Sequence, residues 1–295
     1  MLDRKQCEAF LAVAETGSFE HAGLKLCITP SAVTLRVQAL EKDLGQLLLI
    51  RGRPCVLTQS GQQMLEYLQH TKRLELDFLH NLTGKSEANY FKTVIASNAD
   101  SLATWLLPVL KDVLIKEKII LEIQVDDQSL TYALLEKGTV SACISMESKP
   151  MKGCQAEYLG AMRYRMVSTA QFQKKWFADG ISRDSLRHAP AIIFNHKDHI
   201  HFDVLLKTYG LSKGTYPYHL IPSAESFVTA IRLGLGYGMV PELQLKMERE
   251  DSNIIGLFPE LTVDIPLYWH HWNQQSAPLN NLTEYMIRNA KSVLK

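Results

Sequence analysis

The stretch FEHAGLKLCITPSAVTLRVQALEKDLGQLLLIRG, Phe19 to Gly52, decides the fold at the start of this 295-residue chain. Its pattern predicts two helices, FEHAGLKL and PSAVTLRVQALEKDL, joined by a short turn. Ser18 and Thr29 stand where these helices need an N-cap, and Pro30 follows at a position where its missing N–H costs nothing. Another amphipathic helix is expected just before them, over Gln6–Glu15. Helices joined in this way predict a helix-turn-helix.

The second of these helices has one apolar face and one face of mostly short or polar side chains. The apolar positions recur at helical spacing and are expected to pack inward: Val33, Val37, Leu40 and Leu44. Any three-helix packing needs such a pattern, so a purely structural role stays open. On the opposite face Gln38 can hydrogen-bond base edges in the major groove. The residues expected at DNA from this helix are Pro30, Ser31, Thr34, Leu35, Arg36 and Gln38.

A short β-ribbon is predicted after this helix. Its strands fall at Leu49–Arg51 and Val56–Leu57, turned around Gly52 and Pro54. Two cations, Arg51 and Arg53, lie at the ribbon tip. A basic wing after a helix-turn-helix suits contact with DNA phosphates or the minor groove, so both arginines are expected to bind DNA.

The first sixty residues resemble the winged helix-turn-helix of LysR-type transcriptional regulators. The matching features are the helix Ala22–Leu26, the SAVT start of the second helix within Pro30–Thr34, LE..LG at Leu40–Gly45, Arg51, and LT..G at Leu57–Gly61. One position departs from the family, because Leu35 stands where the family usually has a polar side chain.

A long proline-free helix is expected from Gln59 to about Gly84, followed by the polar linker Thr83–Tyr90. The resemblance implies that this helix connects the domains and pairs with its twin in a homodimer or homotetramer. A helix that packs on its own subunit is the alternative. Paired copies would give a helix-turn-helix the two half-sites that it normally needs.

The composition excludes several classes of protein. With 46% hydrophobic and 21% charged residues, the chain can bury globular cores, and no apolar run is long enough for a transmembrane helix. The first residues lack a signal-peptide pattern, so we expect a cytoplasmic protein without a membrane partner. The net charge of +1 means that the case for DNA rests on the motif. Five scattered cysteines predict free thiols, and neither a metal nor a cofactor is expected.

Strands and helices alternate over the remaining two hundred residues. This alternation predicts parallel sheets covered by helices, which bind ligands outside the carboxyl ends of their strands. One expected helix, Leu102–Leu114, contains Pro108, which should kink it. Trp105 is expected in the core.

The family resemblance covers nearly the whole chain. It implies an α/β protein with a winged helix-turn-helix, a long linker helix and a two-lobed, periplasmic-binding-protein-like (type 2) effector domain. The corresponding ranges are 1–59 for the DNA-binding domain, 60–90 for the linker helix and hinge, and 91–295 for the effector domain. Lobe I would span about 91–161 and 268–295, and lobe II about 162–267.

Three strings resemble the lysine/arginine-responsive ArgP/LysG branch of that family: NADSLATWLLP at 98–108, SAESFV at 223–228 and LYWHH at 267–271. The resemblance implies a regulator that binds double-stranded operator DNA and contacts RNA polymerase. Its effector would be lysine or arginine, and its targets would be genes of basic amino-acid export or metabolism.

A basic amino acid presents one carboxylate and cationic groups, which need donors and acceptors respectively. Donors are expected at the helix start near Asp100, and carboxylates are expected after the strand ILEIQV and at Glu225. A ligand bridging these groups would close one lobe on the other, and Glu225→Gln should then weaken lysine binding. The expected effector residues are Ser97, Asn98, Asp100, Ser101, Asp126, Asp127, His196, Ser223 and Glu225.

Structural alternatives remain for several of these residues. Asp100 could be a plain N-cap, and Glu225 could simply compensate the helix dipole. His196 could line the cleft or cap its loop. Since adjacent side chains diverge, only one of Asp126 and Asp127 is expected to face the cleft.

Other functions find less support in the sequence. An enzyme on the same fold has no G-x-S-x-G, P-loop or HExxH string to support it, so no catalysis is expected. A redox sensor using Cys143 and Cys154 lacks cationic activation near either thiol. A different effector, or a less specific architectural or replication-initiation role on DNA, stays open.

Leu35→Gln should relax an A·T preference at one operator position. Leucine can touch a thymine methyl group but cannot hydrogen-bond a base, whereas glutamine can. Selection from an operator pool randomised at each position, followed by sequencing of the bound fraction, measures this preference for both proteins. An identical base preference in the variant would remove Leu35 from direct base readout.

Overall fold

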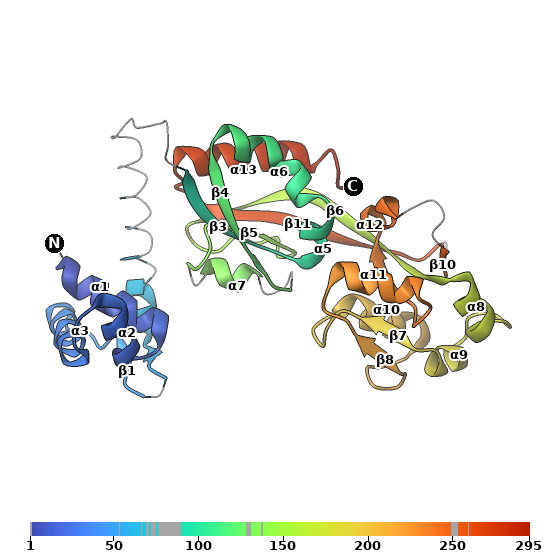
Figure 1. Cartoon of the computed structure of the whole chain (residues 1–295), viewed down its shortest axis with the longest axis horizontal. Helices are drawn as coiled ribbons and strands as arrows, with labels where there is room; N and C mark the ends of the chain where they lie inside the picture. Colours follow the sequence, from blue (N-terminus) through green and yellow to red (C-terminus); the bar gives the residue numbers. More distant parts are fainter. Residues whose placement is uncertain are drawn as a thin grey trace. The chain divides into compact units, whose positions relative to one another are not determined.

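The computed structural model describes residues 2–52, 54–65, 67–68, 71, 75, 90–127, 131–136, 138–248, 253–258 and 260–295. The chain divides into two compact units, Met1–Ala88 and Asn89–Lys295, which are considered separately below. Figure 1 shows the elements of each unit. None of the helices in the described ranges is long and apolar enough to span a membrane.

The first unit is a winged helix-turn-helix, as predicted. Helix ends are fixed by the expected side chains, because Ser18 accepts the N–H of His21 and Thr29 accepts the N–H of Ala32. The strands β1 and β2 pair antiparallel to form the wing. The elements are α1 (Arg4–Thr16), α2 (Phe19–Leu26), α3 (Pro30–Leu44), β1 (Leu49–Ile50) and β2 (Val56–Leu57).

The predicted inner face of α3 is correct except at its end. Val33, Val37 and Leu40 are buried, but Leu44 is 37% exposed. Leu44 is the last residue of α3, where the chain turns away through Gly45 at φ 65°. Glu41 is buried instead, and its carboxylate accepts the N–H of Leu48 at 2.9 Å and of Leu49 at 3.2 Å. Glu41 therefore ties the start of the wing to α3.

The chain continues as a helix after the wing. Residues 59–65, 67–68, 71 and 75 are helical, and Met64, Leu65 and Leu68 are buried in the core of the first unit. The expected linker helix over 60–90 and the linker Thr83–Tyr90 otherwise lie outside the described residues, apart from Tyr90.

A seven-stranded sheet organises the second unit, in the order β10-β6-β11-β5-β3-β4 with β9 paired to β6. The expectation of parallel sheets holds for β3, which is parallel to β4 and β5, and for the separate pair β7 and β8. It is wrong for the long strands, because β6 and β11 carry the chain in opposite directions and pair with each other. The strands are β3 (Phe91–Ser97), β4 (Ile119–Val125), β5 (Ala142–Ser145), β6 (Cys154–Thr169), β7 (Ala191–Ile193), β8 (Tyr218–Leu220), β9 (Gly238–Pro241), β10 (Ile254–Gly256) and β11 (Thr262–Trp272).

The two long strands connect two halves of this unit (Figure 1). One half holds β3, β4 and β5 with α6 and α13, and the other holds β7 and β8 with α10 and α11. The unit is therefore a two-lobed α/β fold. Its helices are α5 (Ala99–Thr104), α6 (Leu106–Lys116), α7 (Thr131–Glu136), α8 (Ala170–Trp176), α9 (Arg183–His188), α10 (His199–Tyr209), α11 (Ala224–Arg232), α12 (Glu242–Met247) and α13 (Ala277–Ala290).

Pro108 breaks the expected helix instead of kinking it. α5 ends at Thr104 and α6 begins at Leu106, with Trp105 between them at φ −117° and only 2% exposed. Pro108 thus lies in the first turn of α6, where its missing N–H leaves no intrahelical bond unmade. Trp105 is in the core, as predicted.

His201 of α10 is a buried, uncharged histidine. Its ring packs beside Tyr237 and Tyr216, with centroids 5.4 Å and 6.1 Å away, and neither ring nitrogen has a hydrogen-bond partner among the described residues. Burial lowers the pKa of His201 from 6.5 to about 3. The unfolded chain therefore takes up a proton at this residue at a pH where the folded protein does not.

His201→Phe should reduce the acid sensitivity of the second unit. The native histidine contributes stability that is complete above pH 6.5 and is lost as pH falls toward 3, about 3 kcal/mol by pH 4. Urea unfolding at pH 7 and pH 4, followed by tryptophan fluorescence, reports on this unit because Trp105, Trp176, Trp269 and Trp272 all lie in it. The exposed His219, changed to Phe, is the control. If the unfolding free energy depends on pH equally in both variants, His201 is not the source of the acid sensitivity.

Candidate functional site

The exposed face of α3 carries the residues predicted to read DNA. Ser31, Leu35 and Gln38 are exposed on it, Leu35 to 66%. Pro30 is exposed at the first position of the helix. Thr34 and Arg36 are half-buried, and the Thr34 hydroxyl donates to the Pro30 carbonyl at 2.9 Å. The six predicted residues therefore lie along one helix, with four of them turned to solvent.

The wing adds one described cation to this unit. Arg51 follows β1, is exposed, and places its guanidinium 5.9 Å from the centre of the Phe19 ring. This contact holds Arg51 beside α2 and leaves its charge accessible. Arg53, the other predicted DNA contact, lies outside the described residues.

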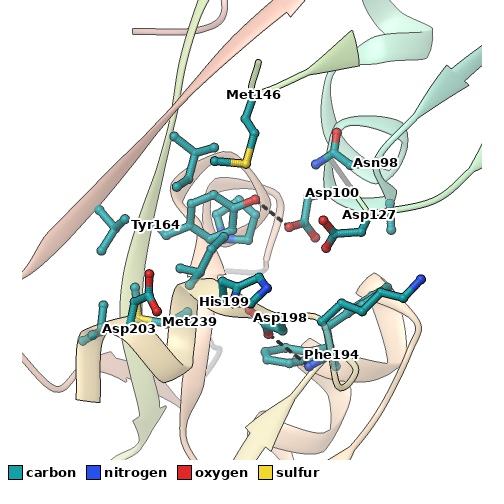
Figure 2. Close-up of a pocket in the computed structure, with 18 of the residues that line it drawn as sticks. Asn98, Asp100, Asp127, Met146, Tyr164, Phe194, Asp198, His199, Asp203 and Met239 are labelled. Atoms are coloured by element: carbon teal, nitrogen blue, oxygen red, sulfur yellow. Dashed lines mark hydrogen bonds between the residues drawn. The ribbon is translucent and has the colours of Figure 1, made fainter. Parts of the chain in front are cut away.

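The second unit contains a cavity of about 390 Å³ lined by both of its halves. Figure 2 shows carboxyl groups from separate segments around it. Its polar and charged lining residues are Asn98, Asp100, Asp126, Asp127, Tyr164, Lys197, Asp198, His199, Asp203, Lys207, Thr208 and Gln244. Apolar side chains, among them Met146, Phe194 and Met239, complete the wall.

Asp100 is held at the cavity by a tyrosine on the long strand β6. The Tyr164 hydroxyl donates to the Asp100 carboxylate at 2.7 Å, and Tyr164 is 2% exposed (Figure 2). Burial raises the pKa of Asp100 to about 6, the Tyr164 hydrogen bond opposes this, and the charges of Asp198 and Asp127 add to the rise. The N-cap of α5 is Asn98, so the interpretation of Asp100 as an N-cap is wrong.

Asp126 and Asp127 both line the cavity, although only one was expected to do so. The Asp126 carboxylate accepts the N–H of Asp127 at 2.8 Å and lies 4.0 Å from the Lys197 ammonium. Both residues lie beyond the end of β4, so the alternation of side chains along a strand does not apply to them. β4 ends at Val125, so both carboxylates follow a strand at its carboxyl end.

Asp198 contributes a further carboxylate, from the start of α10 in the other half. It accepts the Phe194 N–H at 3.2 Å, and its burial raises the pKa of Asp198 while that N–H opposes the rise. Sequence reasoning missed Asp198, Asp203 and Tyr164. The string HKDHIHFD after the strand AIIFN was a usable signal for the aspartates, whereas nothing in the middle of a strand marked Tyr164.

Several predicted effector residues do not line this cavity. Ser97 and Ser101 are fully buried and absent from its described lining, and the Ser97 hydroxyl donates to the Asn98 carbonyl at 3.1 Å. His196 is exposed, and its carbonyl accepts the Lys213 ammonium. Among the described residues, the cavity lining includes neither Ser223, which caps α11 by accepting the Ser226 N–H, nor Glu225, which is exposed in the first turn.

Comparison with known proteins shows to which family the chain belongs. Residues 4–62 match the bacterial regulatory helix-turn-helix protein, lysR family, and residues 95–291 match the LysR substrate binding domain. The HTH-type transcriptional regulator ArgP of Photobacterium profundum is 37% identical over 293 residues, which cover 99% of this chain and 98% of that protein.

Solved structures agree over the full length. ArgP from Mycobacterium tuberculosis superposes with a TM-score of 0.86 at 32% identity, covering 100% of this chain and 99% of that one. Full-length LysG from Corynebacterium glutamicum with bound effector Arg gives 0.80 at 32% identity, covering 99% of each chain. The chain therefore belongs to the LysR family of bacterial helix-turn-helix transcriptional regulators, a family of DNA-binding proteins and not of enzymes, and within it to the branch of ArgP and LysG.

Proposed function

We propose that this regulator binds a basic amino acid, arginine or lysine, in the cavity of the second unit and controls genes of basic amino-acid export or metabolism. The observation that carries this proposal is the charge of the cavity. Its described lining holds the carboxylates of Asp100, Asp126, Asp127, Asp198 and Asp203 and the ammonium groups of Lys197 and Lys207. An excess of carboxylates in a partly buried cavity favours a cationic ligand.

Both lysines already have carboxylate partners. The Lys197 ammonium lies 4.0 Å from Asp126, and the Lys207 ammonium lies 4.0 Å from Asp203. The carboxylates of Asp100, Asp127 and Asp198 also line the cavity and can accept hydrogen bonds from a guanidinium or ammonium group. A planar guanidinium can engage two carboxylate oxygens at once, which suits a site with converging acids.

The carboxylate end of the ligand needs donors. The Asn98 amide lines the cavity at the start of α5. We assign the ligand carboxylate to this amide. The bound arginine of LysG, at 32% identity, supports an amino acid of this class.

The position of the acids suggests how effector binding changes DNA binding. Asp100 and Asp127 belong to one half of the unit, and Asp198 belongs to the other. A cation that contacts both sides stabilises the closed arrangement of the halves, and this differential affinity shifts the equilibrium between two states. In a homodimer or homotetramer in the cytoplasm, the shift would alter operator contacts and the contact with RNA polymerase. The operator contacts would come from Ser31, Thr34 and Gln38, with Arg51 and Arg53 on the DNA backbone.

Asp127→Asn should raise the dissociation constants for arginine and lysine about tenfold or more, because a charge-assisted hydrogen bond contributes about 1.5 to 3 kcal/mol. Isothermal titration calorimetry of the full chain with each amino acid measures the change. Glu225→Gln is the matched control, since it makes the same chemical change on an exposed carboxylate outside the cavity lining.

The opposite pattern, weakened binding in Glu225→Gln and unchanged binding in Asp127→Asn, would move the site away from this cavity. If no basic amino acid gives binding heat or a thermal shift, the effector assignment is overturned. Such a result would leave the membership of the LysR family untouched.

A further inference from the structure

Three carboxyl groups converge on the cavity from three separate segments. Asp100 comes from α5, Asp127 from the turn after β4, and Asp198 from the start of α10. Figure 2 labels all three around the same pocket. Their charges interact, since Asp127 and Asp198 each raise the pKa of Asp100 and Asp127 raises that of Asp198. An empty cavity with all three groups ionised therefore carries mutual repulsion.

The two lysines near this cluster each lie beside another carboxylate. Lys197 lies beside Asp126, and Lys207 lies beside Asp203, one turn further along α10. His199 also lines the cavity and is exposed. Among the described residues no group of three or more histidine, cysteine or acidic side chains is arranged to hold a metal ion. A proton or the cationic group of a ligand can reduce the repulsion within the cluster.

The helices that pack against α5 bring no further charge into the cavity. α11 contributes Ala224 and Phe227 to the described lining, and α12 contributes Gln244. The charged residues of these helices are turned elsewhere or paired: Glu225 is exposed, Arg232 pairs with Glu248 at 3.5 Å, and Glu242 pairs with Arg165 and Lys295 at 2.6 Å each. Lys246 of α12 is also absent from the described lining.

Tyr164 affects the equilibrium between the protonated and ionised forms of Asp100. Its hydroxyl is buried and donates to the Asp100 carboxylate, and the pKa of Tyr164 is raised well above 10 by its burial and by Asp100. The tyrosine therefore stays protonated and acts only as a hydrogen-bond donor near neutral pH. Its donation favours the ionised carboxylate, whereas burial and the neighbouring acids favour the protonated form. These opposing effects leave Asp100 poised to gain or lose a proton.

We propose that Asp100 exchanges a proton for the cationic effector: in mildly acidic solution it carries a proton in the empty cavity, and it releases this proton when the guanidinium or ammonium group binds. This inference rests on the function proposed above. The exchange involves no covalent bond to the ligand. The O–H bond of the Asp100 carboxyl group breaks, the proton passes to the buffer, and the ligand cation takes its place beside the carboxylate. Effector binding then requires both a sufficient ligand concentration and a sufficiently high pH.

The direction of the pH dependence follows from this exchange. With a pKa of about 6, Asp100 is about half protonated at pH 6, about nine-tenths protonated at pH 5 and about one-tenth protonated at pH 7. Binding should release those fractions of a proton. The dissociation constant for arginine should rise about twofold from pH 7 to 6 and about fivefold from pH 6 to 5.

Isothermal titration calorimetry of the full chain with arginine tests the proposal. Titrations at pH 5, 6 and 7, each in buffers of different ionisation enthalpy, give the number of protons released, because the observed heat then varies with the buffer. Arginine keeps its guanidinium charged across this range. A buffer-dependent heat that grows from pH 7 to pH 5 is the expected result, and Glu225→Gln, outside the cavity lining, should preserve it.

Two variants identify the exchanging group. Asp100→Asn cannot ionise, so its residual arginine binding should be weaker and free of proton release. Tyr164→Phe removes the hydrogen bond that lowers the pKa of Asp100, so its proton release should shift to higher pH and become larger at pH 7. That shift distinguishes a positioning role of Tyr164 from a merely structural one. It also shows that Asp100 releases the proton if Asp100→Asn binds arginine too weakly to titrate.

The outcomes separate this inference from the proposed function. Arginine binding without any buffer-dependent heat at pH 5 and 6 would overturn the proton exchange and leave the effector assignment standing. Proton release that persists in Asp100→Asn would overturn the assignment to Asp100. Failure of arginine and lysine to bind at any pH would overturn the proposed effector, and the exchange with it.

Discussion

The antiparallel pairing of β6 with β11 is the constraint on which the second unit depends. Its register runs from Arg165 opposite Thr262 to Cys154 opposite Trp272, so one strand pair belongs to both halves. Arg163 and Asp264, opposite each other in this register, add two guanidinium–carboxylate hydrogen bonds of 2.6 Å. The register shifts only between Leu267 and Tyr268. A shift of this kind bends the strand and increases its local twist.

The same strand pair explains the chemistry of the cavity. Tyr164 lies within β6 and reaches Asp100 on α5, so a side chain fixed by the sheet sets the state of an acid in the cavity wall. The acids facing it come from short segments at the ends of other elements, the turn after β4 and the start of α10. Like charges around one cavity repel each other, and a cation or a proton reduces that repulsion.

The sequence predicted what local interactions determine. Caps such as Ser18 and Thr29 act within three residues, so the helices of the first unit were placed almost to the residue. The sixteen-residue length of β6 could not be predicted from local sequence, because it depends on a partner strand about a hundred residues away. Asp100, Asp126 and Asp127 were found because they follow strands at their carboxyl ends. Glu225 also begins a helix after a strand, but sequence alone does not tell which way the first turn of a helix points.

The small net charge of the chain constrains how it recognises DNA. At a formal charge of +1, long-range attraction to DNA is weak, so close contacts have to supply most of the affinity. Leu35 is 66% exposed on α3, and contact with an apolar base group would recover about 1 kcal/mol by removing it from water. Such a contact forms only when α3 lies close to the bases. Phosphate contacts by the wing would have to form at the same separation of protein and DNA. Glu41 links the wing to α3, because its buried carboxylate binds the start of β1 to the end of α3. The helix and the wing are therefore tied to each other by a buried side chain.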